Sequence, residues 1–158
     1  MRALVGTSLG TAAAAVVGSL ASRSAIDTWY RTIDKPPYVP PNAVFPIAWT
    51  TLYTDIAVTS GKTIDTLGAR GDEQAARSYT AALATNLVLN AGWSWLFFKA
   101  HKLGASAVAA AALTASSADL ARRTAKVSPA SGAALAPYPL WCAFATVMTT
   151  DIWRRNRR

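Results

Sequence analysis

The amino-acid sequence predicts an all-α membrane protein, a bundle of five transmembrane helices in one domain that covers residues 1–158. Hydrophobic residues make up 52% of the chain and charged residues only 15%, whereas soluble domains average about 25% charged residues. The charges also leave five long uncharged stretches, each close to the roughly 20 residues that cross a bilayer core. These stretches lie between Arg2 and Arg23, Lys35 and Asp55, Arg77 and Lys99, Lys102 and Asp119, and Lys126 and Asp151.

The first helix is predicted over residues 4–21. Its small residues recur at every fourth position (Gly6, Gly10, Ala14 and Gly18), a pattern that lets another helix approach closely. The basic start and apolar run also resemble a secretory signal. Because four more apolar stretches follow, we interpret the segment as a retained transmembrane helix.

Residues 22–43 are predicted to form a polar loop, because the prolines in its second half are incompatible with a regular helix. A loop this stiff beside a membrane suits a lid. The remaining helices are predicted over residues 44–61, 77–98, 103–120 and 131–153, and Pro137 and Pro139 are expected to kink or break the last of them. Residues 62–76 are expected to form a charged connection.

An odd number of spans places the two termini on opposite sides of the membrane. The positive-inside rule favours a cytoplasmic C-terminus, because slightly more of the 16 Lys and Arg residues lie on that side. The net charge of +8 would indicate nucleic acid in a soluble protein. Here the basic residues flank apolar stretches and suit lipid headgroups, so the expected partner is the bilayer and no nucleic acid.

Conventional catalytic and metal sites are not expected. The single cysteine, Cys142, excludes an intramolecular disulfide and a zinc-ligand set. The single histidine, His101, lies in a basic turn, which excludes a Ser-His-Asp triad and a bis-histidine haem site. No required cofactor and no metal site are therefore predicted.

Three predicted helices each carry aromatic or amide side chains on one face, at spacings of three and four residues. Together they would enclose an apolar pocket with a few orienting polar groups, as in small-molecule sites. Ordinary helix packing would produce the same stripes. The stripes are Phe45, Trp49 and Tyr53; Asn86, Asn90, Trp93 and Phe97; and Trp141, Ala145 and Thr149.

Two acidic residues, Asp55 and Asp151, lie inside apolar stretches. Carboxylates inside a membrane often mark a proton or ion path, so a small transporter is one hypothesis. The other interpretation is that both residues lie close enough to the membrane surface to be hydrated.

Three blocks of sequence resemble the tryptophan-rich sensory protein or translocator protein family (peripheral-type benzodiazepine receptor, TspO/MBR). They are KPPYVPPNAVFPIAWTTLY at 35–53, preceded by Trp29 and Tyr30, LNAGWSWLFF at 89–98, and PYPLWCAFAT at 137–146. With the five apolar stretches, the resemblance covers essentially the whole chain. It implies a five-helix protein of a bacterial cell membrane.

The resemblance also implies a function. The chain would bind a tetrapyrrole, with protoporphyrin IX or haem as ligand, in porphyrin sensing or transport. The pocket would suit isoquinoline carboxamide and benzodiazepine-type ligands as well. The implied ligand-binding residues are Tyr30, Pro40, Phe45, Trp49, Tyr53, Asn90, Trp93, Trp141 and Ala145.

The alternative implied by some bacterial members is a light-dependent, porphyrin-degrading photo-oxidase, with Trp49 and Trp141 as the catalytic residues. The small pair Ala81 and Thr85 is similar to the family's dimer motif and implies a homodimer. Thr149 and Thr150 replace the residues of the sterol pattern, so sterol binding by that route is not expected.

Overall fold

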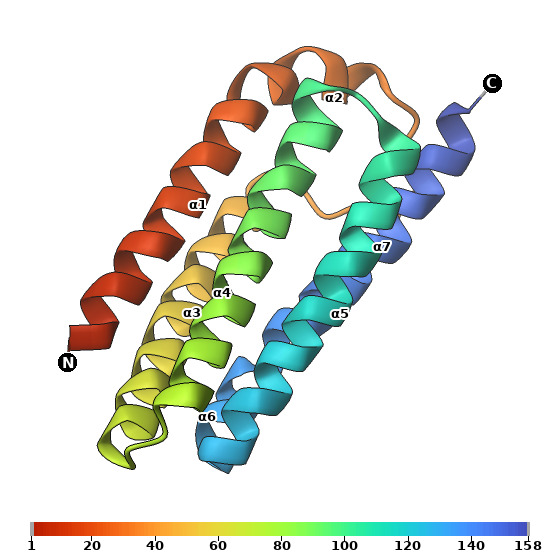
Figure 1. Ribbon diagram of the computed structural model, residues 1–158. Coiled ribbons are helices and arrows are strands. Elements are labelled where there is room, and N and C mark those ends of the chain that lie inside the picture. Colours follow the sequence, from red (N-terminus) through yellow and green to blue (C-terminus); the bar gives the residue numbers. More distant parts are fainter. Residues whose placement is uncertain (1, 158) are drawn as a thin grey trace.

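The computed structural model describes residues 2–157, and this part of the chain contains helices and no strand. Five long helices run alongside one another, and the first begins at the opposite end of the bundle from the end of the last (Figure 1). The long helices are α1 (Arg2–Asp27), α3 (Val44–Ala69), α4 (Glu73–Ser94), α5 (Leu103–Val127) and α7 (Pro137–Asn156). Three short elements connect them, namely α2 (Trp29–Thr32), the π-helical turn η1 (Trp95–Lys99) and α6 (Pro129–Leu135).

Several helices extend beyond the apolar stretches that predicted them. The predicted connection over residues 62–76 is wrong for most of its length, because α3 continues to Ala69 and α4 begins at Glu73. The carboxylate of Asp72 accepts a 3.0 Å hydrogen bond from the Ala75 amide and so caps α4. Charged residues therefore occupy helical turns at the end of the bundle, where hydropathy alone places the helix boundaries too early.

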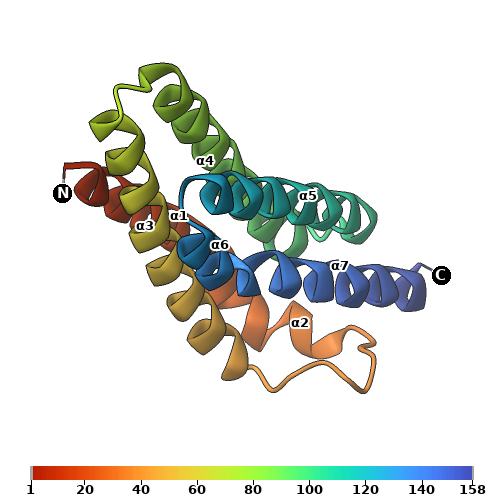
Figure 2. The ribbon, with the colours of Figure 1, turned by 90° about the horizontal axis from the view of Figure 1, so that it is seen from below.

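The predicted lid loop is shorter than residues 22–43. Helix α1 continues to Asp27 and the single turn of α2 follows, so the irregular segment spans residues 33–43. This segment contains the four prolines and a turn in which the Val39 amide donates to the Pro36 carbonyl at 3.2 Å. Seen from below the bundle, it swings out past α2 before it returns to α3 (Figure 2).

The predicted last helix is two helices. Ser128 caps α6 by accepting a hydrogen bond from the Ser131 amide at 3.3 Å, and α6 ends at Leu135. Pro137 then occupies the first turn of α7, a position where its missing N–H leaves no hydrogen bond unmade. The prolines thus start a new helix and do not kink a continuous one.

Helices α1 and α3 approach each other closely at Gly61. A Cβ atom on Gly61 would lie 2.9 Å from the Leu4 Cα atom, so only glycine fits between the two backbones. At the start of α3, the aromatic side chains of Phe45 and Trp49 lie between α3 and α1. The buried core consists of two clusters of side chains. One contains Ile56, Leu120 and Tyr138, and the other contains Phe97 and Met148.

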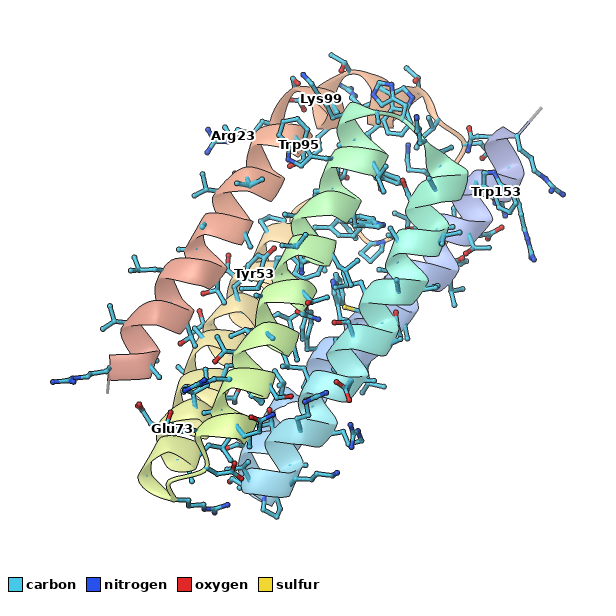
Figure 3. The ribbon with its side chains drawn as sticks, viewed as in Figure 1. Arg23, Tyr53, Glu73, Trp95, Lys99 and Trp153 are labelled. Atoms are coloured by element: carbon cyan, nitrogen blue, oxygen red, sulfur yellow. The ribbon has the colours of Figure 1, made fainter. Side chains whose placement is uncertain are left out.

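Composition supports two of the five predicted membrane spans. Among the described helices, α1 and α5 are long and apolar enough to cross a bilayer. The other three long helices have sufficient length, with 26, 22 and 20 residues in α3, α4 and α7, but their composition falls short. Charged side chains such as Arg23, Lys99 and Glu73 lie toward the two ends of the bundle (Figure 3).

Candidate functional site: an aromatic cavity between α1, α3 and α4

A cavity of about 470 Å³ lies between α1, α3 and α4, toward the end of the bundle that carries α2. Ligand-binding pockets usually measure about 300–1,000 Å³. Its walls also include residues of η1, of the segment before α3, and Met148 of α7. The lining residues are Ala15, Gly18, Ser19, Ser22, Ile26, Tyr30, Asn42, Ala43, Phe45, Pro46, Trp49, Tyr53, Asn90, Trp93, Ser94, Phe97, Phe98 and Met148.

The α3 wall consists of the predicted stripe of Phe45, Trp49 and Tyr53. The rings of Trp49 and Tyr53 lie 5.5 Å apart between centroids, tilted by 32°. Trp49 also meets the buried ring of Tyr138 of α7 edge-on, at 6.4 Å. Packing against Tyr138 therefore holds the partly buried indole in the wall.

The α4 wall continues from Asn90 and Trp93 into η1. The rings of Trp93 and Phe97 are stacked at 5.3 Å with an interplanar angle of 16°. A π-helical turn shifts the register of the side chains that follow it, and both Phe97 and Phe98 line the cavity. Trp93 is 9% exposed, and its Nε1 atom is buried without a hydrogen-bond partner in the described part of the chain.

A chain of side-chain hydrogen bonds leads from the cavity into the core. The Tyr53 hydroxyl donates to Asn90 Oδ1 at 2.7 Å, and Asn90 Nδ2 donates to the Tyr138 hydroxyl at 3.2 Å. The Tyr138 hydroxyl donates to Asn86 Oδ1 at 2.7 Å, and Asn86 Nδ2 donates to Ser116 Oγ at 3.1 Å. Because buried polar groups require partners, this chain orients Tyr53 and Asn90 and leaves one N–H of Asn90 unused.

The cavity is closed at one end by Tyr30 of α2. Lys35 Nζ donates to the carbonyls of Tyr30 and Ile33 at 2.7 and 3.1 Å. The same ammonium lies 4.7 Å from the centre of the Tyr30 ring, a cation–π distance. Burial raises the pKa of Tyr30, so its phenol is uncharged at neutral pH.

The segment between α2 and α3 is attached to the end of α7. The Asp34 amide donates to Asn156 Oδ1 at 3.0 Å, and Asn156 Nδ2 donates to the Asp34 carbonyl at 2.8 Å. The Tyr38 hydroxyl donates to Asp151 Oδ2 at 3.1 Å. Partial desolvation, followed by this hydrogen bond to Asp151, raises the pKa of Tyr38, which keeps the donor proton in place.

Six of the nine predicted ligand-binding residues line the cavity. Pro40, Trp141 and Ala145 do not. Trp141 lies behind Phe45, with ring centroids 6.0 Å apart, and packs against Phe144 at 5.6 Å. The α7 stripe therefore supports the α3 wall, and Met148 is the α7 residue that reaches the cavity.

The two membrane carboxylates are not part of the cavity wall. Asp151 lies at the lid, where it accepts the Tyr38 hydroxyl and lies 3.5 Å from Arg155. Asp55 is half-buried on α3. The structure does not bring the two residues together in one polar path.

Sequence analysis missed the contribution of α1 to the cavity. Ala15, Ser19, Ser22 and Ile26 form one face of α1, and the smallness of the first three leaves space for a ligand. The sequence feature that could have indicated this wall is the row of Ala15, Ser19 and Ser22, which lies at helical spacing beside the row of Gly6, Gly10, Ala14 and Gly18. Nothing aromatic marks it.

The described residues contain no group of three or more His, Cys, Asp or Glu side chains that could hold a metal ion. Cys142 is a buried free thiol, and His101 stacks on Trp29 with ring centroids 4.0 Å apart. Neither residue lines the cavity. The chemistry available inside the cavity is therefore that of aromatic rings, hydroxyl groups, the amides of Asn42 and Asn90, and the indoles of Trp49 and Trp93.

A helical bundle with an aromatic cavity between its helices is typical of a membrane protein that binds a small apolar molecule. Comparison with known proteins identifies the class more closely. The model of the TspO/MBR family matches residues 7–154, and the chain belongs to this family of membrane proteins, as the sequence blocks predicted.

Relatives occur in bacteria and in animals. The chain is 29% identical to the protein CrtK of Rhodobacter capsulatus, over 92% of this chain and 87% of the relative. It is 32% identical to the translocator protein of Ovis aries over 82% of this chain and 75% of that one. It is 27% identical to the tryptophan-rich sensory protein of Cereibacter sphaeroides, over 82% and 78% of the two chains.

Proposed function

We propose that this chain binds a tetrapyrrole, protoporphyrin IX or haem, in the aromatic cavity and acts in porphyrin sensing or transport. The cavity itself carries the proposal. Its volume is about 470 Å³, and aromatic side chains of α2, α3, α4 and η1 line it. Extended aromatic ligands gain from offset and edge-on stacking against such rings. The lining contains no histidine or cysteine, and stacking against the aromatic rings is the contact that this proposal assigns to the macrocycle.

Two hydrogen-bond donors support a ligand that carries acceptor groups. Trp93 Nε1 is buried without a partner among residues 2–157, and an unmade hydrogen bond of this kind costs about 1–3 kcal/mol. Asn90 retains one unused N–H after donating to Tyr138. The carboxylates of a porphyrin, or the carbonyl of an isoquinoline carboxamide or benzodiazepine-type ligand, would accept from these groups.

All five long helices cross the bacterial cell membrane in this proposal. Large apolar side chains face outward on the three helices that composition alone leaves undecided: Ile47 of α3, Val88 of α4, and Leu140 and Val147 of α7 are all more than half exposed, at 68%, 71%, 70% and 61%. The amide side chains Asn86 and Asn90 of α4 face inward and are buried. The excess of basic residues beside the end of α7 supports a cytoplasmic C-terminus.

A homodimer through α4 is part of the proposal. Ala81, Thr85 and Val88 are exposed on one face of α4, and small residues at this spacing allow close helix contact in a membrane. Replacing Thr85 with Phe should shift the protein from dimer to monomer in detergent. An unchanged mass in light scattering would exclude this face.

A second candidate function is light-dependent breakdown of bound porphyrin. Trp49 supports it, because its indole is in the cavity wall and within 5.5 Å of the Tyr53 ring. An excited porphyrin bound here would have an oxidisable indole beside it. Trp141, the other predicted catalytic residue, lies behind Phe45, so the proposal assigns it a supporting role.

The test of tetrapyrrole binding is a titration of the purified full chain with protoporphyrin IX in the dark, followed by quenching of tryptophan fluorescence. Ala15→Phe places a large side chain in the cavity and should weaken binding at least tenfold. Ala13→Phe places the same side chain on the exposed face of α1 and is the matched control. Saturable binding that Ala15→Phe leaves unchanged would place the ligand elsewhere.

A further inference from the structure

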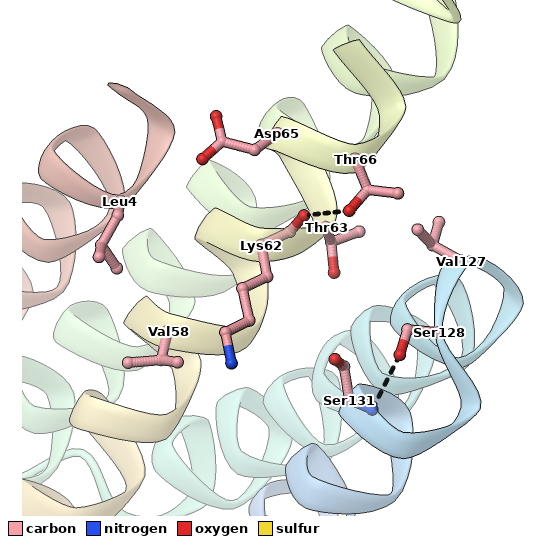
Figure 4. Close-up of a pocket in the computed structure, with 9 residues that line it drawn as sticks. All are labelled: Leu4, Val58, Lys62, Thr63, Asp65, Thr66, Val127, Ser128 and Ser131. Atoms are coloured by element: carbon pink, nitrogen blue, oxygen red, sulfur yellow. Dashed lines mark hydrogen bonds between the residues drawn. The ribbon is translucent and has the colours of Figure 1, made fainter. Parts of the chain in front are cut away.

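A second cavity lies at the opposite end of the bundle from the aromatic one. It measures about 450 Å³ and runs across the outer face of α3, between the start of α1 and the junction of α5 with α6 (Figure 4). Its apolar side consists of Leu4, Val58 and Val127, and its polar side of one lysine, one aspartate and four hydroxyl residues. We call it the Lys62 groove.

The apolar side of the groove is open to the surroundings of the bundle. Leu4 of α1 and Val58 of α3 are exposed by 37% and 36%. In a membrane-embedded bundle, side chains at this position meet lipid acyl chains. The groove therefore offers an apolar contact directly beside its charged group.

The charged group at the centre of the groove is the Lys62 ammonium. The Lys62 side chain is exposed, and its ammonium has no hydrogen-bond or ion-pair partner in the described part of the chain. Its side chain is directed along α3 toward Val58 (Figure 4). A cation this close to apolar surface is costly unless an anion pairs with it or it reaches the headgroup layer.

The nearest carboxylate is turned away from this ammonium. Asp65 also lines the groove, but its carboxylate is directed toward the start of α1, where its Oδ1 atom accepts a 3.3 Å hydrogen bond from the Ala3 amide (Figure 4). On the opposite rim, Arg70 Nη2 donates to the Val127 carbonyl at 3.3 Å and adds a second cation. The charge of the groove thus favours an anion from outside the chain.

Hydroxyl groups at the start of α6 lie opposite Lys62 of α3. The Ser131 amide donates to Ser128 Oγ, which fixes the turn, and the Ser131 side chain is directed toward α3 (Figure 4). A phosphate oxygen held by Lys62 would accept from this hydroxyl. On α3, the Thr66 hydroxyl donates to the Lys62 carbonyl at 2.7 Å and is already used.

We propose that the Lys62 groove binds the phosphate headgroup of an anionic phospholipid. Lys62 pairs with the phosphate, Ser131 donates to it, and the acyl chains lie along Leu4 and Val58. A lysine beside apolar surface suits such a headgroup, because its ammonium can pair with the phosphate while its stem and the neighbouring side chains contact the acyl chains. The site is independent of the aromatic cavity, so it stands or falls separately from tetrapyrrole binding.

The test is native mass spectrometry of the full chain in detergent, titrated with phosphatidylglycerol or with phosphatidylcholine of the same chain length. One basic residue near an anionic lipid surface contributes about 1 kcal/mol, so Lys62→Gln should weaken phosphatidylglycerol binding about fivefold. Lys62→Arg should restore it. Arg77→Gln removes a charge from α4 at the same end of the bundle and should change binding less than twofold.

Equal phosphatidylglycerol binding by the wild type and Lys62→Gln would overturn the proposal. An equal loss of phosphatidylglycerol binding in Lys62→Gln and Arg77→Gln would overturn it too, because it would indicate diffuse electrostatic attraction to this end of the bundle. Millimolar inorganic phosphate that displaces the lipid would show a site for free phosphate instead.

Ser131→Glu tests the groove from α6 without altering Lys62, should Lys62→Gln fail to fold. Its carboxylate should reduce phosphatidylglycerol binding at least fivefold and leave phosphatidylcholine binding unchanged, and an unaltered affinity would overturn the proposal.

Discussion

The hydroxyl of Tyr53 donates a 2.7 Å hydrogen bond to Oδ1 of Asn90 and joins α3 to α4 at the wall of the aromatic cavity. Both side chains line the cavity, and Asn90 in turn donates to Tyr138 of α7. One amide therefore links three helices. The pair shapes the binding surface and stabilises the helices that carry it.

Removing either partner of this pair should lower the stability of the protein. Tyr53→Phe leaves Asn90 Oδ1 without a donor, and Asn90→Leu leaves the Tyr53 hydroxyl without an acceptor; each change should cost about 1–3 kcal/mol. The double variant should cost less than the sum, because the second change removes a group that has already lost its partner. Thermal unfolding in detergent measures all three. Additive losses would show that the two residues act independently.

The close approach of α1 and α3 should make Gly61 intolerant of substitution. Gly61→Ala places a Cβ atom 2.9 Å from the Leu4 Cα atom, and overpacking of this kind costs about 1–3 kcal/mol. Gly68→Ala, on the same helix, meets nothing within 4 Å and should be neutral or slightly stabilising. Melting temperatures of the two variants provide the comparison. Equal stability would mean that α1 moves aside at little cost.

Trp49 and Trp141 should differ in their effect on the ligand. Trp49 lines the cavity, whereas Trp141 lies behind Phe45. Trp49→Phe should weaken protoporphyrin IX binding several-fold in the dark, and Trp141→Phe should change it less than twofold. Under illumination, loss of the porphyrin absorbance band should slow in Trp49→Phe and continue in Trp141→Phe. The reverse order would place the ligand nearer to α7.

The attachment of the lid to α7 should control how fast a ligand leaves. Asn156→Ala removes both hydrogen bonds to the Asp34 backbone and should accelerate porphyrin dissociation, with a smaller effect on the association rate. Arg154→Ala, an exposed neighbour on α7, is the control. Stopped-flow displacement of bound porphyrin measures the rates. Identical dissociation in both variants would show that the segment does not gate the cavity.

The helical architecture and the α3 and α4 walls of the site were predictable from local pattern. Phe45, Trp49 and Tyr53 share a face because their spacing of four matches the helical repeat, and Asn90 and Trp93 do so for the same reason. That argument does not depend on neighbouring helices. It fails for Trp141, whose stripe is equally regular, because periodicity shows which residues share a face and not what that face meets.

The positions at which α3 ends and α4 begins could not be predicted from hydropathy either. The segment 62–76 contains enough charge to resemble a loop, yet most of it continues α3 and starts α4. A helix whose end leaves the apolar layer satisfies its own backbone hydrogen bonds and loses nothing by carrying charge there. Two adjacent residues mark the boundary locally: Gly71, with φ +73°, ends α3, and Asp72 caps α4 through its hydrogen bond to Ala75.

The sequence by itself determined the helical character, the family and the residues that form the α3 and α4 walls, since these depend on composition and on spacing along one chain. The tertiary structure decided which helices face the cavity. The α1 wall is made of small residues whose role is the space they leave, and space exists only once other helices surround it. The same holds for the Lys62 groove, where Leu4, Lys62 and Ser131 come from three helices that only packing brings together.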